Sequence, residues 1–388
     1  MTTLDTAAAT VVLAVNSGSS SLKFALFEIN DGSERRVAEG AVERVGGDGG
    51  RAWIRQGTAQ TERESTCEDH GAALDVAFEL LAERGLERVK VAGHRVVHGG
   101  PEHVQPAIVD DALVASLRLI VPLAPLHMPA SIAGIEAIAA RHPTLPQVVC
   151  FDTAFHATLP EVARRLPLPD RFKDVRRYGF HGLSYEYVMS TLGDAPSRIV
   201  IAHLGNGASL VAVKDGRAID TTMGLTPTGG ILMGTRTGDL DPGVLVYLAR
   251  EKGLGPDALE HLVDRESGLL AIGGSSDMKT LLERVETDSR ARLAVEMFGY
   301  AVRKAIGAFA AALGGIDLLV FTGGIGERAA KVRAEACRGL EPFGIEVDAE
   351  RNAHNEEIIS GTRSCSVVRV VKTDEDLVIA RHARRLVG

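Results

Sequence analysis

The stretch Val11-Val-Leu-Ala-Val-Asn-Ser-Gly-Ser-Ser-Ser-Leu-Lys-Phe-Ala-Leu-Phe27 decides the fold, because it joins two apolar runs through a short polar turn. Residues 11–15 and 22–27 have the length and composition of buried strands. Residues 16–21 between them are typical turn residues, so the stretch predicts a β-hairpin. A plain hairpin turn is one interpretation. Lys23 inside the second strand favours another, in which the hairpin binds phosphate, although neither standard phosphate-binding glycine motif is present.

The same arrangement occurs a second time. The run Arg198-Ile-Val-Ile-Ala-His-Leu204 is followed by the turn Gly205-Asn-Gly207 and by a second apolar run, residues 208–213. A further turn at 214–217 leads into another short strand. One supersecondary unit is therefore used twice, which predicts two related domains.

Helical patterns alternate with these strands. Residues 72–84, 130–141 and 184–192 have the periodicity of amphipathic helices, and residues 292–313 are apolar on most faces, as expected of a core helix. Strands that alternate with helices indicate an α/β fold.

Length, charge and cysteine content narrow the class of protein. The 388 residues, 45% of them hydrophobic, exceed one typical domain, so we expect two. A net charge of -8 without any Lys/Arg block argues against nucleic acid or an anionic membrane as partner. The first ten residues lack a basic region, and the apolar run at 11–15 is too short for a signal core or membrane span. Scattered cysteines without C-x-x-C spacing indicate packed, reduced thiols and a cytoplasmic protein; they are Cys67, Cys150, Cys337 and Cys365.

Four short segments carry the side chains needed to hold and transfer a phosphoryl group. Phe151-Asp-Thr-Ala-Phe-His156, Tyr178-Gly-Phe-His-Gly182 and His203-Leu-Gly-Asn-Gly207 supply a carboxylate, imidazoles and a glycine turn. Gly323-Gly-Ile-Gly-Glu327 follows an apolar strand at 316–321 and precedes a helical stretch. A glycine turn between strand and helix lets backbone N–H groups meet a nucleotide.

The histidines also allow structural interpretations. His94-Arg-Val-Val-His98 has two imidazoles four residues apart, but no glutamate lies between them and the flanking glycines oppose a helix, which argues against zinc. His181 and His203 can each be read as satisfied core histidines. Their positions beside glycine turns favour a functional role instead.

Two charged segments, residues 235–241 and 283–292, have structural interpretations. Thr235-Arg-Thr-Gly-Asp-Leu-Asp241 fits a capped turn before a helix that starts near Pro242, and its aspartates need no other role. Capping does not explain Arg236. The charged residues at 283–292 indicate a solvated helix face.

At these residues the chain resembles the acetate kinases, a family within the acetate and sugar kinase, Hsp70 and actin superfamily. The resemblance covers nearly the whole chain, and the family's motifs appear in the family's order. They are Asn16-Ser-Gly-Ser-Ser-Ser-Leu-Lys23, Gly93-His-Arg-Val-Val-His-Gly-Gly100, Phe151-Asp-Thr-Ala-Phe-His156, Arg177-Tyr-Gly-Phe-His181, His203-Leu-Gly-Asn-Gly207, Met233-Gly-Thr-Arg236 and Gly323-Gly-Ile-Gly-Glu327.

The resemblance implies roles for the matching residues. Arg95 corresponds to the substrate arginine, Arg236 to a second active-site arginine, Asp152 to the essential aspartate and His181 to the transition-state histidine. Asn16 and Glu375 correspond to the Mg²⁺ shell, with Mn²⁺ as an alternative ion, and Lys23 to a phosphate contact. The acid would lie in a small apolar pocket formed by Val97, Leu126, Phe180 and Pro227, together with Arg95. The nucleotide contacts are His203, Leu204, Gly205, Asn206, Gly207, Asp277, Met278, Lys279, Gly324, Ile325, Gly326, Glu327 and Arg328.

Some residues depart from the family's pattern. Lys279 stands where an arginine is usual, and Arg328 where an asparagine is common. Leu183 and Tyr185 replace the usual Thr and His, and Pro227-Thr-Gly-Gly230 replaces Pro-Leu-Glu-Gly. None of these positions belongs to the implied phosphoryl-transfer set, but they leave base selectivity and the loop before Arg236 less defined.

The resemblance implies an architecture and an activity. We expect two duplicated ribonuclease H-like (actin-like ATPase) domains with an ATP cleft between them, residues 11–151 plus 376–388 and a nucleotide-binding domain at 152–375 through which a homodimer forms. The implied activity is reversible, Mg²⁺-dependent in-line phosphoryl transfer between ATP and acetate. A propionate or butyrate kinase is the close alternative, because one methylene in an apolar pocket discriminates by only about 1–3 kcal/mol. A nucleotide-switched chaperone or filament protein is the non-enzymatic alternative, and it would not need two arginines and a histidine at an acid pocket.

Overall fold

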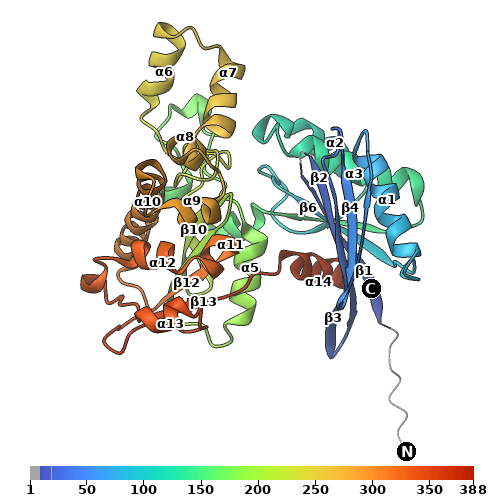
Figure 1. The fold of residues 1–388 in the computed structure, drawn as a ribbon. Coiled ribbons are helices and arrows are strands. Elements are labelled where there is room, and N and C mark those ends of the chain that lie inside the picture. Colours follow the sequence, from blue (N-terminus) through green and yellow to red (C-terminus); the bar gives the residue numbers. More distant parts are fainter. Residues whose placement is uncertain (1–8, 19) are drawn as a thin grey trace, which may run out of the picture. The chain divides into compact units, whose positions relative to one another are not determined.

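The computed structural model describes residues 9–18 and 20–388, and its contacts divide the chain into two compact units. The first unit is the chain up to Ala154 together with Asp374–Gly388, and the second is Phe155–Thr373 (Figure 1). The predicted domain boundaries, after 151 and after 375, lie within a few residues of these division points. Asp152 and Glu375 both fall in the first unit, which matters for the site described below.

The first unit is built on a mixed sheet whose order, in the part of the chain that the structure describes, is β5-β4-β3-β2-β1-β6-β8-β7. β1 to β5 form an antiparallel series, whereas β6 is parallel to β1 and β8 is parallel to β6. The strands are β1 (Thr10–Gly18), β2 (Ser21–Asn30), β3 (Ser33–Glu43), β4 (Arg51–Gln56), β5 (Ala59–Glu64), β6 (Val91–Val96), β7 (Ala107–Ile108) and β8 (Gln147–Phe151).

Helices cover this sheet on both faces. Side chains at alternate positions of β1, such as Leu13 and Val15, join one apolar cluster with α1 (His70–Ala82) and α3 (Met128–Arg141). α14 (Glu375–Val387), the last element of the chain, packs on β1, β2, β6 and β8 (Figure 1). The remaining helices of this unit are α2 (Asp111–Leu119) and the single 3₁₀ turn η1 (Val121–Leu123).

The predicted turn at 16–21 is wrong in detail, because strand pairing continues through most of it. β1 extends to Gly18 and β2 begins at Ser21, so that Asn16 lies opposite Lys23 in the antiparallel register. Backbone hydrogen bonds across the hairpin outweigh the turn propensity of the polar residues. The hairpin therefore places Asn16 and Lys23 side by side.

The second unit repeats the central part of the first. Among the described residues its sheet has the order β11-β10-β9-β12-β13, with β9 and β10 antiparallel, β10 and β11 antiparallel, and β12 parallel to both β9 and β13. The order and directions match β3-β2-β1-β6-β8, so the predicted duplication is confirmed. The strands are β9 (Arg198–Leu204), β10 (Ala208–Lys214), β11 (Arg217–Thr221), β12 (Leu318–Thr322) and β13 (Val367–Val370).

The helices of the second unit pack against this sheet or against one another. Their bounds are α4 (Glu161–Arg164), α5 (Gly182–Thr191), α6 (Pro242–Glu251), α7 (Pro256–His261), α8 (Gly268–Gly273), α9 (Met278–Arg284), α10 (Ser289–Leu313), α11 (Gly323–Arg328), α12 (Ala330–Cys337) and α13 (Ala349–Ala353). Single turns occur at η2 (Ala154–Thr158), η3 (Asp170–Phe172), η4 (Leu262–Glu266) and η5 (Glu341–Phe343).

Three helix predictions need correction. The predicted glycine turn at 323–327 is itself helical, as α11, and α12 follows it as a separate helix. Residues 283–292 are not one helix face: they span the end of α9, a turn and the start of α10, where the Asp288 side chain caps α10. α10 is buried on one side only, since Leu293, Met297 and Tyr300 are exposed.

Of the helices that the structure describes, none combines the length and the apolar character that a membrane crossing requires.

Candidate functional site

An ion-paired cluster lies at the carboxyl ends of β6 and β8. Arg95 is near the end of β6, and Asp152 follows β8 directly, with its backbone N–H donating to the Val96 carbonyl at 3.0 Å. Arg95 donates from Nε and Nη2 to the Asp152 carboxylate, at 3.0 and 2.6 Å, and its Nη1 lies 3.7 Å from Glu375 Oε2. Glu375 is the first residue of α14, so the last helix of the chain completes the cluster.

The charges in this cluster depend on one another. The Asp152 side chain is only 1% exposed, and such a carboxylate is stable only when it is paired. Burial lowers the pKa of Arg95, but the charges of Asp152 and Glu375 outweigh it, so the pKa is raised and the guanidinium is permanently charged. Asp152 therefore accepts hydrogen bonds from a cation that does not titrate.

The first turn of α14 is tied to the sheet by Arg36 on β3. Arg36 donates to Asp374 at 2.6 Å and to Glu39 at 2.8 Å, and lies 3.4 Å from Asp376. Asp374 also caps α14 by accepting from the Leu377 N–H. Burial raises the pKa of Asp376 to about 6, with Arg36 opposing the rise. These contacts fix the backbone that carries Glu375.

Asn16 and Lys23 belong to the same unit. Val15 pairs with His94 at the end of the parallel β1–β6 ladder, so the next residues, Asn16 and Arg95, occupy neighbouring positions at the carboxyl ends of these strands. Asn16 is half-buried, whereas Lys23 on the neighbouring strand is exposed. The first unit thus brings together Asn16, Arg95, Asp152 and Glu375.

In the second unit, His181 and His203 form a stacked pair with ring centroids 4.3 Å apart. Both are 9% exposed. His181 precedes α5 in a left-handed conformation, at φ 60°. Its Nδ1 lies 2.8 Å from Ser209 Oγ, and His203 Nδ1 lies 2.8 Å from Ser184 Oγ. The imidazoles are therefore ordered by hydroxyl groups.

Arg236 and His181 converge on the glycine turn after β9. A methyl group added at Gly207 would lie 3.4 Å from His181 Nε2 and 3.5 Å from Arg236 Nη1. Arg236 also donates to the Pro227 carbonyl at 3.2 Å. A cation and an imidazole thus flank a position where the backbone carries no side chain, an arrangement suited to binding an anion.

The predicted nucleotide segments also meet in the second unit. Gly234 N–H donates to the Asn206 carbonyl at 3.0 Å, and a methyl at Gly234 would lie 1.9 Å from Asn206 Oδ1 and 3.2 Å from the Ser276 carbonyl. A methyl at Gly323 would lie 2.8 Å from the Leu204 carbonyl. The structure therefore brings the 203–207 turn, the 276–279 turn and the start of α11 together.

Within these segments the side chains differ in exposure. Leu204, Met278 and Gly326 are buried, Gly205, Gly207, Ile325 and Glu327 are half-buried, and Asn206, Asp277, Lys279, Gly324 and Arg328 are exposed. Asp277 caps α9, and the hydroxyl and backbone hydrogen bonds it accepts from Thr280 and Lys279 outweigh desolvation and hold its pKa below the usual value. The Glu327 carboxylate accepts from the Thr373 N–H at 3.2 Å.

The four predicted pocket residues are divided between the units. Val97 and Leu126 are half-buried in the first unit. Phe180 is buried and Pro227 is half-buried, and both belong to the second unit.

Several histidines and aspartates have structural roles. His94 lies on β6, where its Nε2 is 2.7 Å from Gln147 Oε1, and burial lowers its pKa to about 4. Burial lowers the pKa of His156 to about 4 as well. Asp241 caps α6, and Asp239 accepts from the Gly230 N–H at 2.7 Å. The capping prediction is therefore confirmed for Asp241, whereas Asp239 holds the Gly230 loop.

Sequence reasoning missed the residues that support the site. Ser209, Tyr185 and Ser184 contact the histidine pair or each other, and Arg36 fixes α14. One of these residues could have been noticed in the sequence: Ser209 is a hydroxyl residue within the apolar part of a predicted strand. Partners so far apart in sequence become visible only once the strands are in register.

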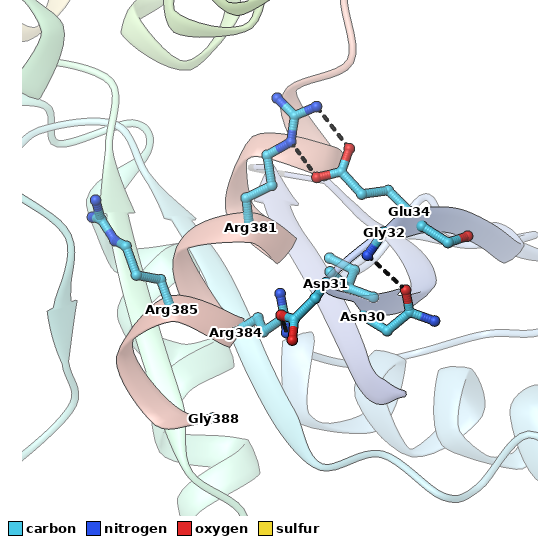
Figure 2. A pocket seen from close by; sticks show the side chains of 10 residues that line it. Asn30, Asp31, Gly32, Glu34, Arg381, Arg384, Arg385 and Gly388 are labelled. Carbon is cyan, nitrogen blue, oxygen red and sulfur yellow. Dashed lines mark hydrogen bonds and ion pairs between the residues drawn. The ribbon is translucent and has the colours of Figure 1, made fainter. Parts of the chain in front are cut away.

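A pocket of about 790 Å³ lies elsewhere in the first unit, between the β2–β3 turn and the end of α14 (Figure 2). Arg381 is paired with Glu34 through two contacts of 2.7 Å, and Arg384 is paired with Asp31. None of the predicted site residues lines it. Because its arginines are largely neutralised by carboxylates, this pocket is not a strong anion site.

Known proteins resemble this chain over nearly its whole length. Residues 11–381 match the acetokinase family. The chain is 45% identical to acetate kinase of Streptomyces avermitilis, over 98% of each protein. Among solved structures, acetate kinase of Porphyromonas gingivalis has a TM-score of 0.89 at 37% identity, covering 98% of this chain and 100% of that one. A propionate kinase of Francisella tularensis has a TM-score of 0.92 at 34% identity, covering 97% and 99%. These likenesses confirm the predicted fold class.

Proposed function

The chain belongs to the acetokinase family, and it is therefore a kinase whose phosphoryl acceptor is a carboxyl group; within that class, we propose that it transfers the phosphoryl group between ATP and acetate. The observation that carries this proposal is the convergence of Arg236 and His181 on the Gly207 turn. A guanidinium and an imidazole placed there can stabilise the charge that grows on a phosphoryl group during in-line transfer.

The proposed nucleophile needs little activation. A small carboxylic acid with a pKa of roughly 4.3 is ionised at neutral pH, so no strong general base is required. Asp152 is in any case occupied by two hydrogen bonds from Arg95. The difficulty is to bring one anion up to another, and Arg95 and Arg236 can neutralise the carboxylate and the phosphoryl oxygens.

We propose Mg²⁺ as the metal, with Mn²⁺ as an alternative. The oxygen donors of Asp152, Glu375 and Asn16 fit such an ion, and no cluster of three or more acidic, histidine or cysteine ligands occurs among the described residues. That pattern suits Mg²⁺, which keeps several waters and binds through one or two carboxylates and substrate phosphates. When bound, the ion would offset the charge of the phosphates.

ATP is the proposed nucleotide, held by the 203–207 turn, by residues 277–279 and by residues 324–328. The exposed backbone at Gly324 and the start of α11 offers N–H groups to phosphate or ribose. Lys23 would add a positive charge near the phosphates. Lys279 is less suited than an arginine to stack on a base, so tolerance for GTP is part of what must be measured.

Propionate is the second candidate acceptor, because the propionate kinase of Francisella tularensis is as similar in structure as the acetate kinases. Val97, Leu126, Phe180 and Pro227 would contact the alkyl group. Side chains of this size favour a short acid, but one methylene changes affinity by only about 1–3 kcal/mol. Butyrate is a weaker alternative for the same reason.

Trapping of acyl phosphate with hydroxylamine tests the proposal. Purified protein with Mg-ATP should give acid-dependent product with acetate, propionate and butyrate, with the highest kcat/KM for acetate, and none without acid. The Asp152→Asn variant serves as the control for a contaminating kinase. A higher kcat/KM with propionate would change the assigned acceptor. ATP hydrolysis without any acyl phosphate would contradict the proposed reaction and favour a nucleotide switch.

We also propose that the two units are the two expected domains, 11–151 plus 376–388 and 152–375, except that Asp152 and Glu375 belong with the first, and that the protein is a cytoplasmic homodimer. The support for a dimer is an apolar stripe on α10, where Leu293, Met297 and Tyr300 are 50%, 40% and 56% exposed. Residues three and four apart lie on one helix face, so these side chains form a continuous patch.

Met297→Asp should shift the protein from dimer to monomer in analytical ultracentrifugation. A charge at the centre of an apolar interface must be desolvated without a partner, which costs several kcal/mol. Leu119→Asp is the matched control, since Leu119 on α2 in the first unit is 82% exposed. An unchanged dimer in Met297→Asp, or dissociation in both variants, would argue against α10 as the interface.

A further inference from the structure

The imidazole of His181 is supported by two hydroxyl groups in series. Ser209 Oγ lies 2.8 Å from His181 Nδ1, and it also lies within hydrogen-bond distance of the Tyr185 hydroxyl. Ser209 and Tyr185 are both fully buried. Ser209 comes from β10 and Tyr185 from α5, so two elements that flank the histidine fix this series.

The direction of the Tyr185–Ser209 hydrogen bond decides where the protons of this series lie, because each hydroxyl has one proton to donate. If Tyr185 donates to Ser209, then Ser209 is left to donate to His181 Nδ1, which must be unprotonated. The neutral imidazole then carries its proton on Nε2.

We infer that Tyr185 and Ser209 are positioning residues that hold His181 in the Nε2–H tautomer. The inference rests on the proposed phosphoryl transfer, because Nε2 is the atom that faces Gly207 and Arg236. A proton on Nε2 donates to an anion bound there, whereas a lone pair on Nε2 repels it. The wrong tautomer of a correctly placed histidine costs an enzyme several orders of magnitude in rate.

The neighbouring histidine shows the same construction. His203 Nδ1 lies 2.8 Å from Ser184 Oγ, and Ser184 Oγ lies 2.9 Å from Thr373 Oγ1. Two imidazoles stacked at 4.3 Å would repel each other if both were charged. A neutral pair avoids this repulsion, and the tautomer assigned to His181 is a neutral form.

Tyr185→Phe and Ser209→Ala test the inference, because each removes one hydroxyl and adds no atoms. We expect kcat to fall about tenfold to hundredfold, as for other groups that orient a functional histidine, with KM for acid and ATP within about twofold. Thr221→Val is the matched control: Thr221 is buried on the neighbouring strand β11, and its hydroxyl donates to the Leu210 carbonyl at 2.9 Å. Its kcat should stay at the wild-type value.

Nitrogen-15 NMR of the full-length protein labelled at histidine gives a direct readout. His181 is assigned by its absence in His181→Asn, and the shifts of its two ring nitrogens report which one carries the proton. Wild type and Thr221→Val should show protonated Nε2 and unprotonated Nδ1, and Tyr185→Phe and Ser209→Ala should show a mixture. Protonated Nδ1 in the wild type, or wild-type kcat in both variants, would overturn the inference.

The control separates this role from a structural one. Equal losses of kcat and melting temperature in Thr221→Val and Ser209→Ala would assign the effect to the sheet and contradict the inference. Wild-type protein that makes no acyl phosphate from any acid would instead refute the proposed reaction. The two failures are therefore distinguishable.

Discussion

Arg95→Lys should lower kcat on the order of 10³-fold or more, by analogy with arginines that stabilise phosphoryl transfer. The guanidinium of Arg95 uses two nitrogens on Asp152 and presents the third to Glu375. A lysine ammonium is a point charge and cannot reproduce this planar set of donors. We therefore expect the positive charge to be retained and the activity to be lost.

Steady-state acyl phosphate formation measures this effect, with melting temperature as a check on folding. Lysine is a better probe than alanine, because alanine would leave the buried Asp152 charge unpaired, a loss of about 3–5 kcal/mol in stability. Arg118→Lys is the matched control, since Arg118 pairs with Glu136 on the surface of the same unit and is 61% exposed. Near wild-type turnover in Arg95→Lys would show that the planar donor set is not needed.

Asp152→Asn should also lower kcat by on the order of 10³-fold, because it removes the charge that orients Arg95 and that would face the metal. The side chain keeps its size, so the fold should be retained. Asp110→Asn is the matched control: Asp110 caps α2 by accepting from the Leu113 N–H, and asparagine caps a helix equally well.

The residual activity of Asp152→Asn distinguishes two roles for this carboxylate. If Asp152 acts by orienting Arg95 and binding Mg²⁺, the variant should need more Mg²⁺ and should gain little from higher pH. Weaker stabilisation of the variant by Mg-ADP in thermal unfolding would support the same role without an activity measurement. Recovery at high pH with unchanged Mg²⁺ dependence would identify Asp152 as a proton acceptor instead.

The repeated sheet could be predicted from sequence because each half contains a local pattern of strands and turns. Apolar runs of strand length surround polar turns at 11–27 and again at 198–213, and these patterns do not depend on the rest of the chain. Local signals failed where tertiary contacts compete with them. Asn16 and Ser17 read as a turn but are paired as a strand, and Gly323 reads as a turn but starts α11.

The site was predictable only in part for the same reason. Recognisable motifs contain Arg95, Asp152, His181 and Arg236. The structure pairs Arg95 with Asp152 in the first unit and places His181 near Arg236 in the second. Their supports do not stand in motifs. Arg36 reaches Asp374 from the other end of the chain, and the Tyr185 hydroxyl on α5 meets Ser209 on β10.

The position of α14 has a consequence for biosynthesis. This helix is synthesised after the whole second unit, yet it packs on β1 and β6, which are synthesised before that unit. Its fit is close, since a methyl group at Gly93 would lie 2.5 Å from Ile379 Cγ2. The second unit is one continuous segment and can fold as soon as Thr373 has emerged. Until α14 follows, one face of the first unit's sheet is uncovered, so the nascent chain exposes apolar strands while the second unit is made, and Arg95 meets Glu375 only after α14 has emerged.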